Sequence, residues 1–283
     1  MKIVILTRDV PNQVALCHLL EPHCEIKAIV VSENIPKKKP DFSKNSKIFL
    51  NRISQRLVGK IFVTSWFEAL KEYQKDYANF PDVPLVKVKN VNEVETLETL
   101  EKYSPDLVIV SSTNLVGKKV IETAKKKKGI VNLHTGISPY VKGGPNCTNW
   151  CLAQAWFHLI GNTIMWLDTG IDTGKIITTE QTALDGLETL TKLQYKNMVH
   201  GNDLYVRAIC QIAEGKQVPA VSQNSIDEGT TFYTSEWDLF AMLQAKKNFE
   251  RHYAKYFANK ENHQQLTSKL KLVSLNEEND LEK

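Results

Sequence analysis

The alternation of short apolar runs with helical patterns constrains the fold of this chain more than any other feature. Lys2–Leu6 and Ile26–Val31 are predicted strands, with a helix over Asn12–Leu20 between them. Val83–Val88 and Leu107–Val110 are further predicted strands. The second of these is apolar throughout, which is typical of a strand covered on both faces. Strands that alternate with helices favour an α/β fold with a mostly parallel, doubly wound sheet.

Further along the chain, the same patterns predict the remaining elements. Glu93–Tyr103 is amphipathic and ends at Ser104-Pro105, because the residue before proline is pushed out of the helical region. Gly117–Lys128 is predicted to be a lysine-rich helix with Gly129 as its C-cap. The other predicted elements are strands over Ile130–His134, Thr163–Leu167 and Lys175–Thr179, and helices over Asn149–Trp156, Leu187–Glu214 and Trp237–Tyr256.

A long insert separates the second strand from Val83. It opens with an exposed lysine-rich turn at 36–40, and residues 41–77 look helical, with a basic half and an aromatic half. The basic half contains Lys44, Lys47, Arg52, Arg56 and Lys60, and the aromatic half contains Trp66, Phe67, Tyr73 and Tyr77. Both an acceptor-recognition appendage and a solvated helical excursion fit this pattern.

The domain organisation follows from these segments. We predict a catalytic domain over residues 1–215 with the basic helical insert at about 36–80. Residues 216–283 are predicted to form a partly helical C-terminal extension with a flexible tail. Leu239, Phe240 and Leu243 of the last predicted helix are expected to pack back on the sheet.

Composition narrows the class of protein. Hydrophobic residues make up 42% of the chain and the net charge is +4, which permits an anionic ligand without demanding nucleic acid. The chain lacks both an apolar run long enough to cross a bilayer and a secretory signal pattern at its start. Its 5 cysteines lack framework spacing. Cys147 and Cys151 alone make a poor zinc site. We therefore expect a cytoplasmic protein with reduced thiols, no metal and no membrane association.

The strand Ile130–His134 carries the polar residues of greatest interest. Alternate residues of a strand share a face, so Asn132 and His134 point the same way while Val131 and Leu133 face the core. These two polar side chains lie at the carboxyl end of a buried strand, where open α/β sheets place their ligands.

A loop rich in aspartate and glycine, Asp168–Gly174, can bring Asp172 back towards His134. An asparagine amide can donate a hydrogen bond to an oxyanion, which lowers the activation barrier by about 3 kcal/mol. A histidine can move a proton, and a carboxylate can orient the imidazole. Acyl transfer to an amine needs a donor to the oxyanion, a group that moves the proton and a group that orients it. The chain has no Gly-x-Ser-x-Gly nucleophile elbow, which fits a reaction without a protein nucleophile. The residues alone also fit a structural strand followed by a simple turn.

Further segments follow Asn132 and His134 in a defined order. They are Ser138-Pro139, Gly143-Gly144, Pro145, Trp150, Gly161-Asn162-Thr163-Ile164 and Leu167 through Gly174. Together these segments resemble the folate-dependent formyltransferases, a family that includes glycinamide ribonucleotide, methionyl-tRNA and sugar-nucleotide formyltransferases. The resemblance is strongest from about Asp106 to Ile177 and extends to the N-terminal strands in pattern only.

The resemblance implies a Rossmann-like formyltransferase fold, 10-formyltetrahydrofolate as the formyl donor, and catalytic roles for Asn132, His134 and Asp172. It also implies main-chain contacts to the pterin ring from two loops. These contacts fall on Ser112, Thr113, Asn114 and Leu115, and on Asp168, Thr169, Gly170 and Ile171. Of the two loop aspartates, Asp172 matches the catalytic one, and Asp168 shapes the loop.

Departures from the family pattern bear on the acceptor. Glycinamide ribonucleotide enzymes carry a glycine-rich phosphate loop after the first strand, whereas Thr7–Asn12 here contains no glycine. Methionyl-tRNA enzymes carry a basic barrel after the core, and the C-terminal part of this chain is too helical for one. A nucleotide-linked amino sugar therefore becomes the expected acceptor, as in bacterial lipopolysaccharide O-antigen biosynthesis. Methionyl-tRNA and, less favoured, glycinamide ribonucleotide stay as alternative acceptors.

Other functional classes leave different signatures. A dehydrogenase would need Gly-x-Gly-x-x-Gly after the first strand, and this motif is missing. An RNA-binding module and an inactive folate-binding scaffold are the non-enzyme alternatives. Arg8, Trp66, Tyr233 and Trp237 are candidates for contacts to phosphates or a base, but packing or surface positions are equally typical of them, so they are not assigned as sites. Enzymes of this type are often dimers, so a homodimer is expected.

Overall fold

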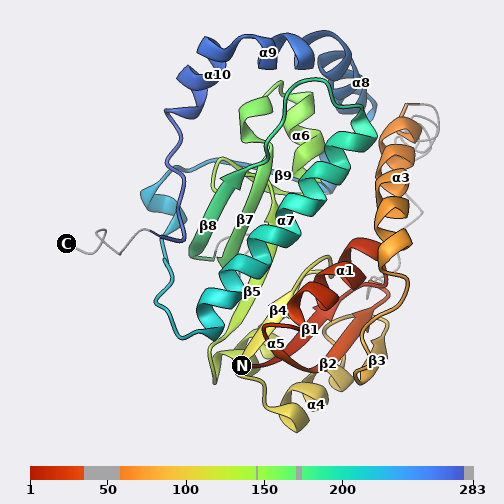
Figure 1. Cartoon of the computed structure of the whole chain (residues 1–283), viewed down its shortest axis with the longest axis vertical. Helices are drawn as coiled ribbons and strands as arrows, with labels where there is room; N and C mark the ends of the chain where they lie inside the picture. Colours follow the sequence, from red (N-terminus) through yellow and green to blue (C-terminus); the bar gives the residue numbers. More distant parts are fainter. Residues whose placement is uncertain (35–57, 145, 170–173, 277–283) are drawn as a thin grey trace.

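The predicted strands form one mixed, mostly parallel sheet. In the computed structural model, which describes residues 1–34, 58–144, 146–169 and 174–276, the strand order is β3-β2-β1-β4-β5-β7-β8 (Figure 1). The strands are β1 (Lys2–Thr7), β2 (Glu25–Ser32), β3 (Leu85–Val88), β4 (Leu107–Val110), β5 (Ile130–Thr135), β7 (Gly161–Trp166) and β8 (Ile176–Gln181). β3, β2, β1, β4 and β5 pair in parallel, and β7 runs antiparallel to both β5 and β8. The predicted α/β class with a mostly parallel sheet is confirmed.

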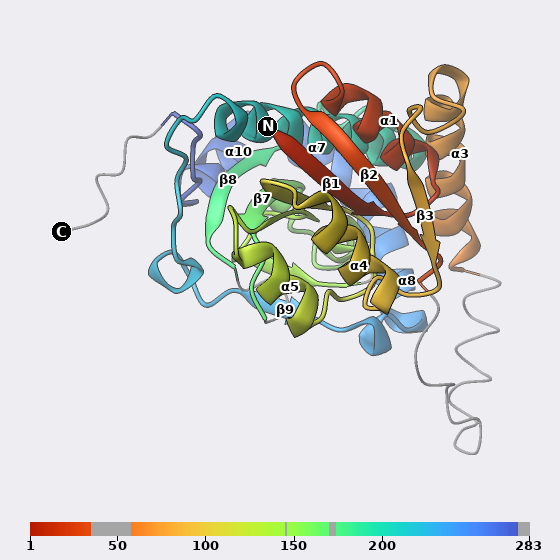
Figure 2. The same ribbon diagram turned by 90° about the horizontal axis from the view of Figure 1, so that it is seen from below.

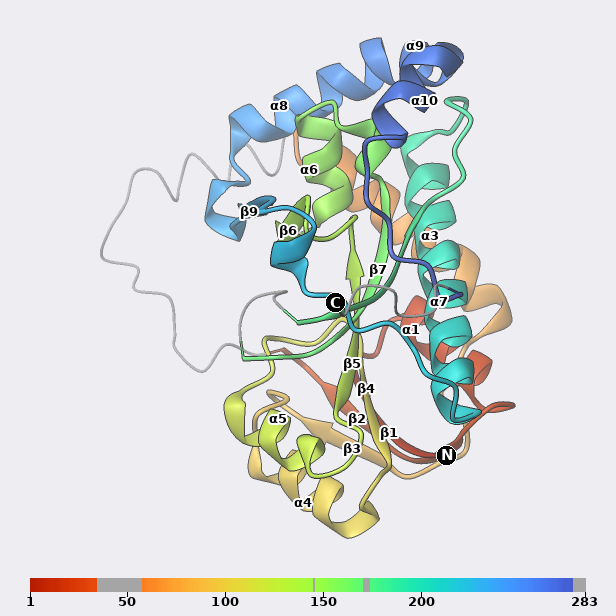
Figure 3. The same ribbon diagram turned by 90° about the vertical axis from the view of Figure 1, so that its left-hand side faces the viewer.

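Helices cover both faces of this sheet. α4 (Val94–Tyr103) and α5 (Lys118–Lys125) lie on one face, α1 (Pro11–Leu20) and α7 (Leu190–Ala213) lie on the other, and α3 (Lys60–Asp76) packs on α1 and α7 (Figures 2 and 3). Successive strand residues point to opposite faces. Accordingly, Ile3 and Ile5 belong to the core beneath α1 and α7, while Val4 and Leu6 belong to the core beneath α4 and α5.

The C-terminal part of the chain wraps around the end of the sheet that carries β7 and β8. It contains β9 (Thr230–Phe232), α8 (Leu239–Asn248), a π-helix η4 (Phe249–Tyr253), α9 (Ala254–Ala258) and α10 (Lys260–Thr267). β9 pairs in parallel with β6 (Val141–Gly143), outside the main sheet. After α10 the chain returns to β8, where the N–H of Thr179 donates to the carbonyl of Val273 at 2.8 Å. The predicted flexible tail was given no exact start, and residues 277–283 at its end lie outside the described residues.

A third core joins α8 and η4 to α6 (Cys147–Ala153). Trp150 of α6 stacks on Phe232 with ring centroids 4.4 Å apart and meets Trp237 edge-on at 5.0 Å. The prediction that Leu239, Phe240 and Leu243 pack on the sheet is wrong, because these side chains are 41%, 74% and 47% exposed. α8 packs on α6 and turns its small and flexible residues, Ala241, Met242 and Ala245, inwards.

Several element boundaries differ from the predicted ones for local reasons. α5 ends at Lys125, before the predicted Lys128, because Lys126 and Lys127 make the tighter bonds to carbonyls three residues back. α6 begins at Cys147, before the predicted Asn149, because the Asn146 side chain caps it by accepting from the N–H of Thr148 at 2.9 Å. The single helix predicted over 237–256 is divided by the π-helix η4.

Candidate active site

The carboxyl ends of β1, β4 and β5 meet at one edge of the sheet and line a large cavity. Arg8 follows β1, and the segment from Ser111 to Val116 follows β4. Asn132 and His134 lie within β5, towards its carboxyl end. All of these residues line the cavity. The cavity volume is about 960 Å³, at the upper end of the range of about 300–1,000 Å³ typical of ligand sites. This space is sufficient for the reacting parts of two small molecules.

Asn132 and His134 point to the same side of the sheet, as predicted from their spacing. Both line the cavity. Val131 is fully buried in the core beneath α7, and Leu133 packs against that core while also contributing to the cavity wall. Asn132 is half-buried, and His134 is only 7% exposed. β5 is held between β4 and β7, so the two side chains project from a rigid strand.

The imidazole of His134 is oriented by main-chain and thiol groups. Its Nε2 lies 3.1 Å from the carbonyl oxygen of Val141 and 3.5 Å from Sγ of Cys147. A carbonyl oxygen only accepts, so Nε2 carries a proton and Nδ1 is the basic nitrogen of the neutral ring. The Cys147 thiol in turn donates to the carbonyl of Gly143 at 3.4 Å. These contacts fix the orientation of the imidazole ring.

The turn after β5 is built tightly around His134. Thr163 Oγ1 donates to the carbonyl of Gly136 at 2.7 Å and accepts from the N–H of Ser138 at 2.9 Å. Gly136 has φ +122°, and a Cβ there would lie 2.9 Å from the Cβ of Cys147 and 3.4 Å from Nε2 of His134. Glycine is therefore required, both for the backbone conformation and for the space beside the imidazole.

The first loop implied for pterin binding lies in the cavity wall. Ser112, Thr113, Asn114 and Leu115 all line the cavity, and Ser112 adopts a left-handed conformation with φ +64°. Asn114 anchors the loop from behind, since its Oδ1 accepts from the N–H of Val91 at 3.1 Å. The loop thus presents its backbone to the cavity while its one amide side chain is engaged with neighbouring segments.

The second implied loop is only partly described. Asp168 Oδ1 accepts from Lys125 Nζ at 3.0 Å and from the N–H of Thr169 at 2.8 Å, and these bonds hold the pKa of Asp168 below its usual range. The carboxylate is 56% exposed and shapes the loop rather than the cavity wall. Gly170, Ile171 and Asp172 lie outside the described residues, as does the predicted approach of Asp172 to His134.

The structure also places in the cavity residues that the sequence analysis named as candidates without assigning them as sites. Arg8, Trp66, Tyr233 and Trp237, which were not assigned as sites, all line it. α3, the described helix of the insert, contributes Phe62, Val63, Trp66 and Phe67. The sequence pattern predicted a helix with aromatic residues here, but it carried no information on which part of the fold this helix would pack against. The basic segment 44–56 of the insert lies outside the described residues.

A second unpredicted feature is the number of carboxamides in the wall. Asn146, Asn149, Gln194 and Asn197 line the cavity on α6 and α7. Among the described lining residues, Arg8 is the one lysine or arginine, and aspartate and glutamate do not occur. Nor do the described residues contain a cluster of His, Cys, Asp or Glu that could hold a metal ion. The site can therefore polarise a carbonyl with Asn132 and move a proton with His134, and it offers a ligand mostly neutral hydrogen-bonding groups together with the guanidinium of Arg8.

The described helices were compared with the length and hydrophobicity that a membrane-spanning helix needs. α7 is the longest helix given by the structure, and neither it nor any other described helix is long and apolar enough to cross a membrane.

Comparisons with known proteins agree with this geometry. Residues 1–209 match the family model described as formyl transferase. The methionyl-tRNA formyltransferase of Clostridium beijerinckii is 30% identical over 139 residues, which are 49% of this chain and 42% of that protein. The chain thus spans less than half the length of this curated relative.

Solved structures share the fold. A sugar N-formyltransferase from Shewanella sp FDAARGOS_354 has a TM-score of 0.54 and 13% identity, covering 87% of each chain. A phosphoribosylglycinamide formyltransferase from Anaplasma phagocytophilum has a TM-score of 0.53 and 15% identity, covering 83% of this chain and 98% of that one. At these identities the likeness concerns the fold, and the two named activities differ in their acceptor.

Proposed function

Because this chain belongs to the formyl transferase family, we propose that it is an N-formyltransferase acting on a nucleotide-linked amino sugar. The formyl donor in this proposal is 10-formyltetrahydrofolate, bound as a co-substrate along the loop from Ser112 to Leu115 and the loop from Asp168 to Ile171. The observation that carries the proposal is one cavity of about 960 Å³ whose wall contains both the implied donor loop, from Ser112 to Leu115, and the pair Asn132 and His134.

The mechanism follows from the atoms that face the cavity. The neutral amine of the acceptor attacks the formyl carbon directly, and negative charge develops on the formyl oxygen. Nδ2 of Asn132 donates to this oxygen, which lowers the barrier by about 3 kcal/mol. Nδ1 of His134 accepts the proton that the attacking nitrogen loses, because Nε2 is already protonated and bound to Val141. Asp172 is assigned the role of orienting the imidazole and stabilising its charged form.

The leaving group takes a proton as the carbon–nitrogen bond of the donor breaks, and the protonated His134 supplies it. The proton balance therefore closes within the site, and no covalent bond to the protein forms. The thiol nearest the reacting atoms, Cys147, is fully buried and donates to the carbonyl of Gly143. A nucleophilic thiol would have to be an exposed thiolate.

Three features of the cavity support a nucleotide-linked sugar as the acceptor. Arg8 provides one guanidinium, which suits a phosphate. Trp66 and Tyr233 provide aromatic faces on which a base can stack. The segment from Thr7 to Asn12 lacks the glycines of a backbone phosphate cradle, which argues against glycinamide ribonucleotide.

Methionyl-tRNA is the alternative acceptor, favoured by the name of the curated relative. A tRNA acceptor needs a row of cations that follows its phosphates. Among the described residues of the cavity wall, Arg8 is the one lysine or arginine. Lys125 of the basic helix α5 is paired with Asp168. These observations favour the sugar.

The proposal also covers the organisation and setting of the protein. It assigns residues 1–215 to the catalytic domain and 216–283 to an extension, and it places a cytoplasmic homodimer in lipopolysaccharide O-antigen biosynthesis. Light scattering of the purified chain tests the dimer, and limited proteolysis tests the boundary.

Release of tetrahydrofolate from 10-formyltetrahydrofolate tests the reaction itself. The panel of acceptors contains nucleotide-linked amino sugars, glycinamide ribonucleotide and charged initiator tRNA, and His134→Ala serves as the inactive control. Turnover with a sugar that the control lacks is the expected result. Turnover with tRNA alone would replace the acceptor, and retention of a radiolabelled formyl group on the protein would refute direct attack.

A further inference from the structure

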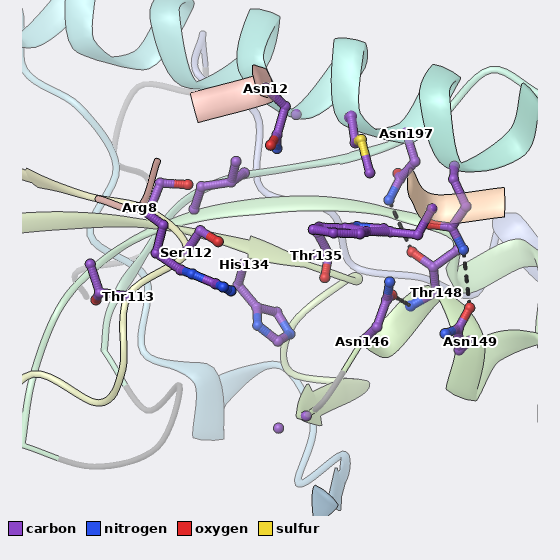
Figure 4. Close-up of a pocket in the computed structure, with 18 of the residues that line it drawn as sticks. Arg8, Asn12, Ser112, Thr113, His134, Thr135, Asn146, Thr148, Asn149 and Asn197 are labelled. Carbon is purple, nitrogen blue, oxygen red and sulfur yellow. Dashed lines mark hydrogen bonds between the residues drawn. The ribbon is translucent and has the colours of Figure 1, made fainter. Parts of the chain in front are cut away.

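One wall of the cavity is made of neutral polar side chains that bind one another. This amide wall consists of Asn146, Thr148, Asn149, Gln194 and Asn197, from the N-terminal end of α6 and the N-terminal part of α7 (Figure 4). Nε2 of Gln194 donates to Oδ1 of Asn149 at 3.0 Å, and Nδ2 of Asn197 donates to Oγ1 of Thr148 at 3.0 Å. These bonds hold the side chains in one arrangement, so the wall is preorganised.

The bond between Asn149 and Gln194 leaves a donor and an acceptor for a ligand. Asn149 is 9% exposed and Gln194 is 2% exposed. Within the described part of the chain, neither Nδ2 of Asn149 nor Oε1 of Gln194 makes a hydrogen bond, although both residues line the cavity. Neither atom belongs to the fully enclosed polar atoms that lack a partner, so both are accessible and are placed for a bound molecule or for water that it displaces.

A donor next to an acceptor has a specific chemical match. A hydroxyl group both donates and accepts, whereas an ammonium only donates and a phosphate oxygen only accepts. The described lining residues contain no carboxylate that would hold an ammonium. The pair formed by Asn149 and Gln194 therefore favours a neutral hydroxyl over either charged group.

We propose that the amide wall determines acceptor specificity, and that Asn149 and Gln194 bind a ring hydroxyl of the acceptor sugar. This inference rests on the proposed function, since it presupposes an amino-sugar acceptor. The wall arises from α6 and α7, whereas the implied donor loop follows β4 and the reacting pair lies on β5. Changes in the wall therefore alter the choice of acceptor and leave donor binding unchanged.

The test compares acceptor sugars that differ by a single hydroxyl. From the best nucleotide-linked amino sugar, analogues deoxygenated at each ring carbon in turn are assayed for kcat/KM with the wild type and with Gln194→Met. Methionine keeps the length of the side chain and removes its hydrogen bonds. With one analogue, the kcat/KM of the wild type is expected to fall about tenfold or more. The variant is expected to have the same kcat/KM for the parent sugar and for that analogue.

Two further variants keep the test decisive. Asn149→Asp retains the acceptor for Gln194 but replaces the Nδ2 donor by oxygen, so it too is expected to lose the preference. Asn248→Leu is the matched control, because Asn248 is an equally buried carboxamide that donates to the carbonyls of Leu152 and Ala153 away from the cavity. The control is expected to lower stability and to keep the wild-type preference, with the KM for 10-formyltetrahydrofolate unchanged in every variant.

The possible results distinguish a failure of the amide-wall role from a failure of the proposed acceptor class. A wild type that formylates sugars without preferring any hydroxyl, or variants that retain the wild-type preference, would refute the role of the amide wall alone. A wild type that formylates no amino sugar would refute both the acceptor class and the inference drawn from it.

Discussion

The buried carboxylate of Glu188 joins the C-terminal extension to the helix that carries the amide wall. Its side chain is 1% exposed. It accepts from Lys196 Nζ at 2.5 Å, from the Tyr253 hydroxyl at 2.8 Å and from the N–H groups of Asp185 and Gly186 at 3.1 and 3.0 Å. Lys196 belongs to α7 and Tyr253 to η4, so removal of this carboxylate is expected to loosen both the fold and one side of the cavity.

The size of the effect follows from the pKa of Glu188. Burial alone would raise this pKa, but the hydrogen bonds from Lys196, Tyr253 and the backbone lower it from 4.5 to about 2. Each tenfold change in acid dissociation corresponds to 1.36 kcal/mol, so the difference amounts to about 3 kcal/mol of stability. The folded-state pKa lies below the unfolded one. The contribution is therefore complete above about pH 4.5 and is lost as the pH falls towards about 2.

Urea denaturation between pH 3 and pH 7.5, followed by tryptophan fluorescence, measures this contribution. Glu188→Gln is expected to lower the free energy of unfolding by about 3 kcal/mol at pH 7, and the deficit is expected to shrink below pH 4.5. The control is Glu122→Gln, since Glu122 is 60% exposed and only 3.6 Å from Lys118; such surface pairs contribute about 0–1 kcal/mol. A Glu188→Gln deficit that is equal at all pH values, or no larger than that of the control, would refute the reasoning.

Four further substitutions test the site and its support. His134→Ala and Asp172→Asn are each expected to lower kcat by about 10²–10⁴-fold with little change in Tm, because the first removes the group that transfers the proton and the second removes the charge that stabilises it. Near-normal turnover of either variant in a steady-state assay would overturn the assignment. Gly136→Ala is expected to destabilise by about 1–2 kcal/mol through its positive φ and to lower kcat by about 10²-fold by displacing the imidazole, and a stability loss without a kcat loss would show that the ring tolerates the methyl group. Tyr205→Phe is expected to lower the free energy of unfolding by about 1–3 kcal/mol, since its buried hydroxyl accepts from β4 at 3.2 Å and donates to β5 at 2.6 Å, and thermal denaturation checks this against unchanged kcat.

Much of the candidate site could be predicted from the sequence because it depends on local geometry. A strand repeats every two residues, so the spacing of Asn132 and His134 by itself places both on one face. The apolar run at Leu107–Val110 likewise indicates a central strand, and such strands end at the ligand edge of the sheet. The positions of Ser112 to Leu115 in the cavity wall follow from the same rule.

Errors arose where a helix has several surfaces to choose from. Leu239, Phe240 and Leu243 mark an apolar stripe, but α8 buries Ala241 and Met242 against α6 instead. Hydropathy ranks the larger side chains higher, whereas close packing of two helices favours whichever side fits the partner's shape. The identity of the partner is absent from the local pattern.

For this protein, the sequence by itself determined the alternating α/β order, the shared face of Asn132 and His134 and the family resemblance, since each depends on residues close together along the chain. Only the tertiary structure decided which surfaces close the cavity. α3 brings Trp66 to it from the insert, the extension brings Trp237, and α7 sets Gln194 against Asn149 of α6. These contacts join residues far apart in the sequence, and they depend on how the packed helices fit together, which no local periodicity encodes.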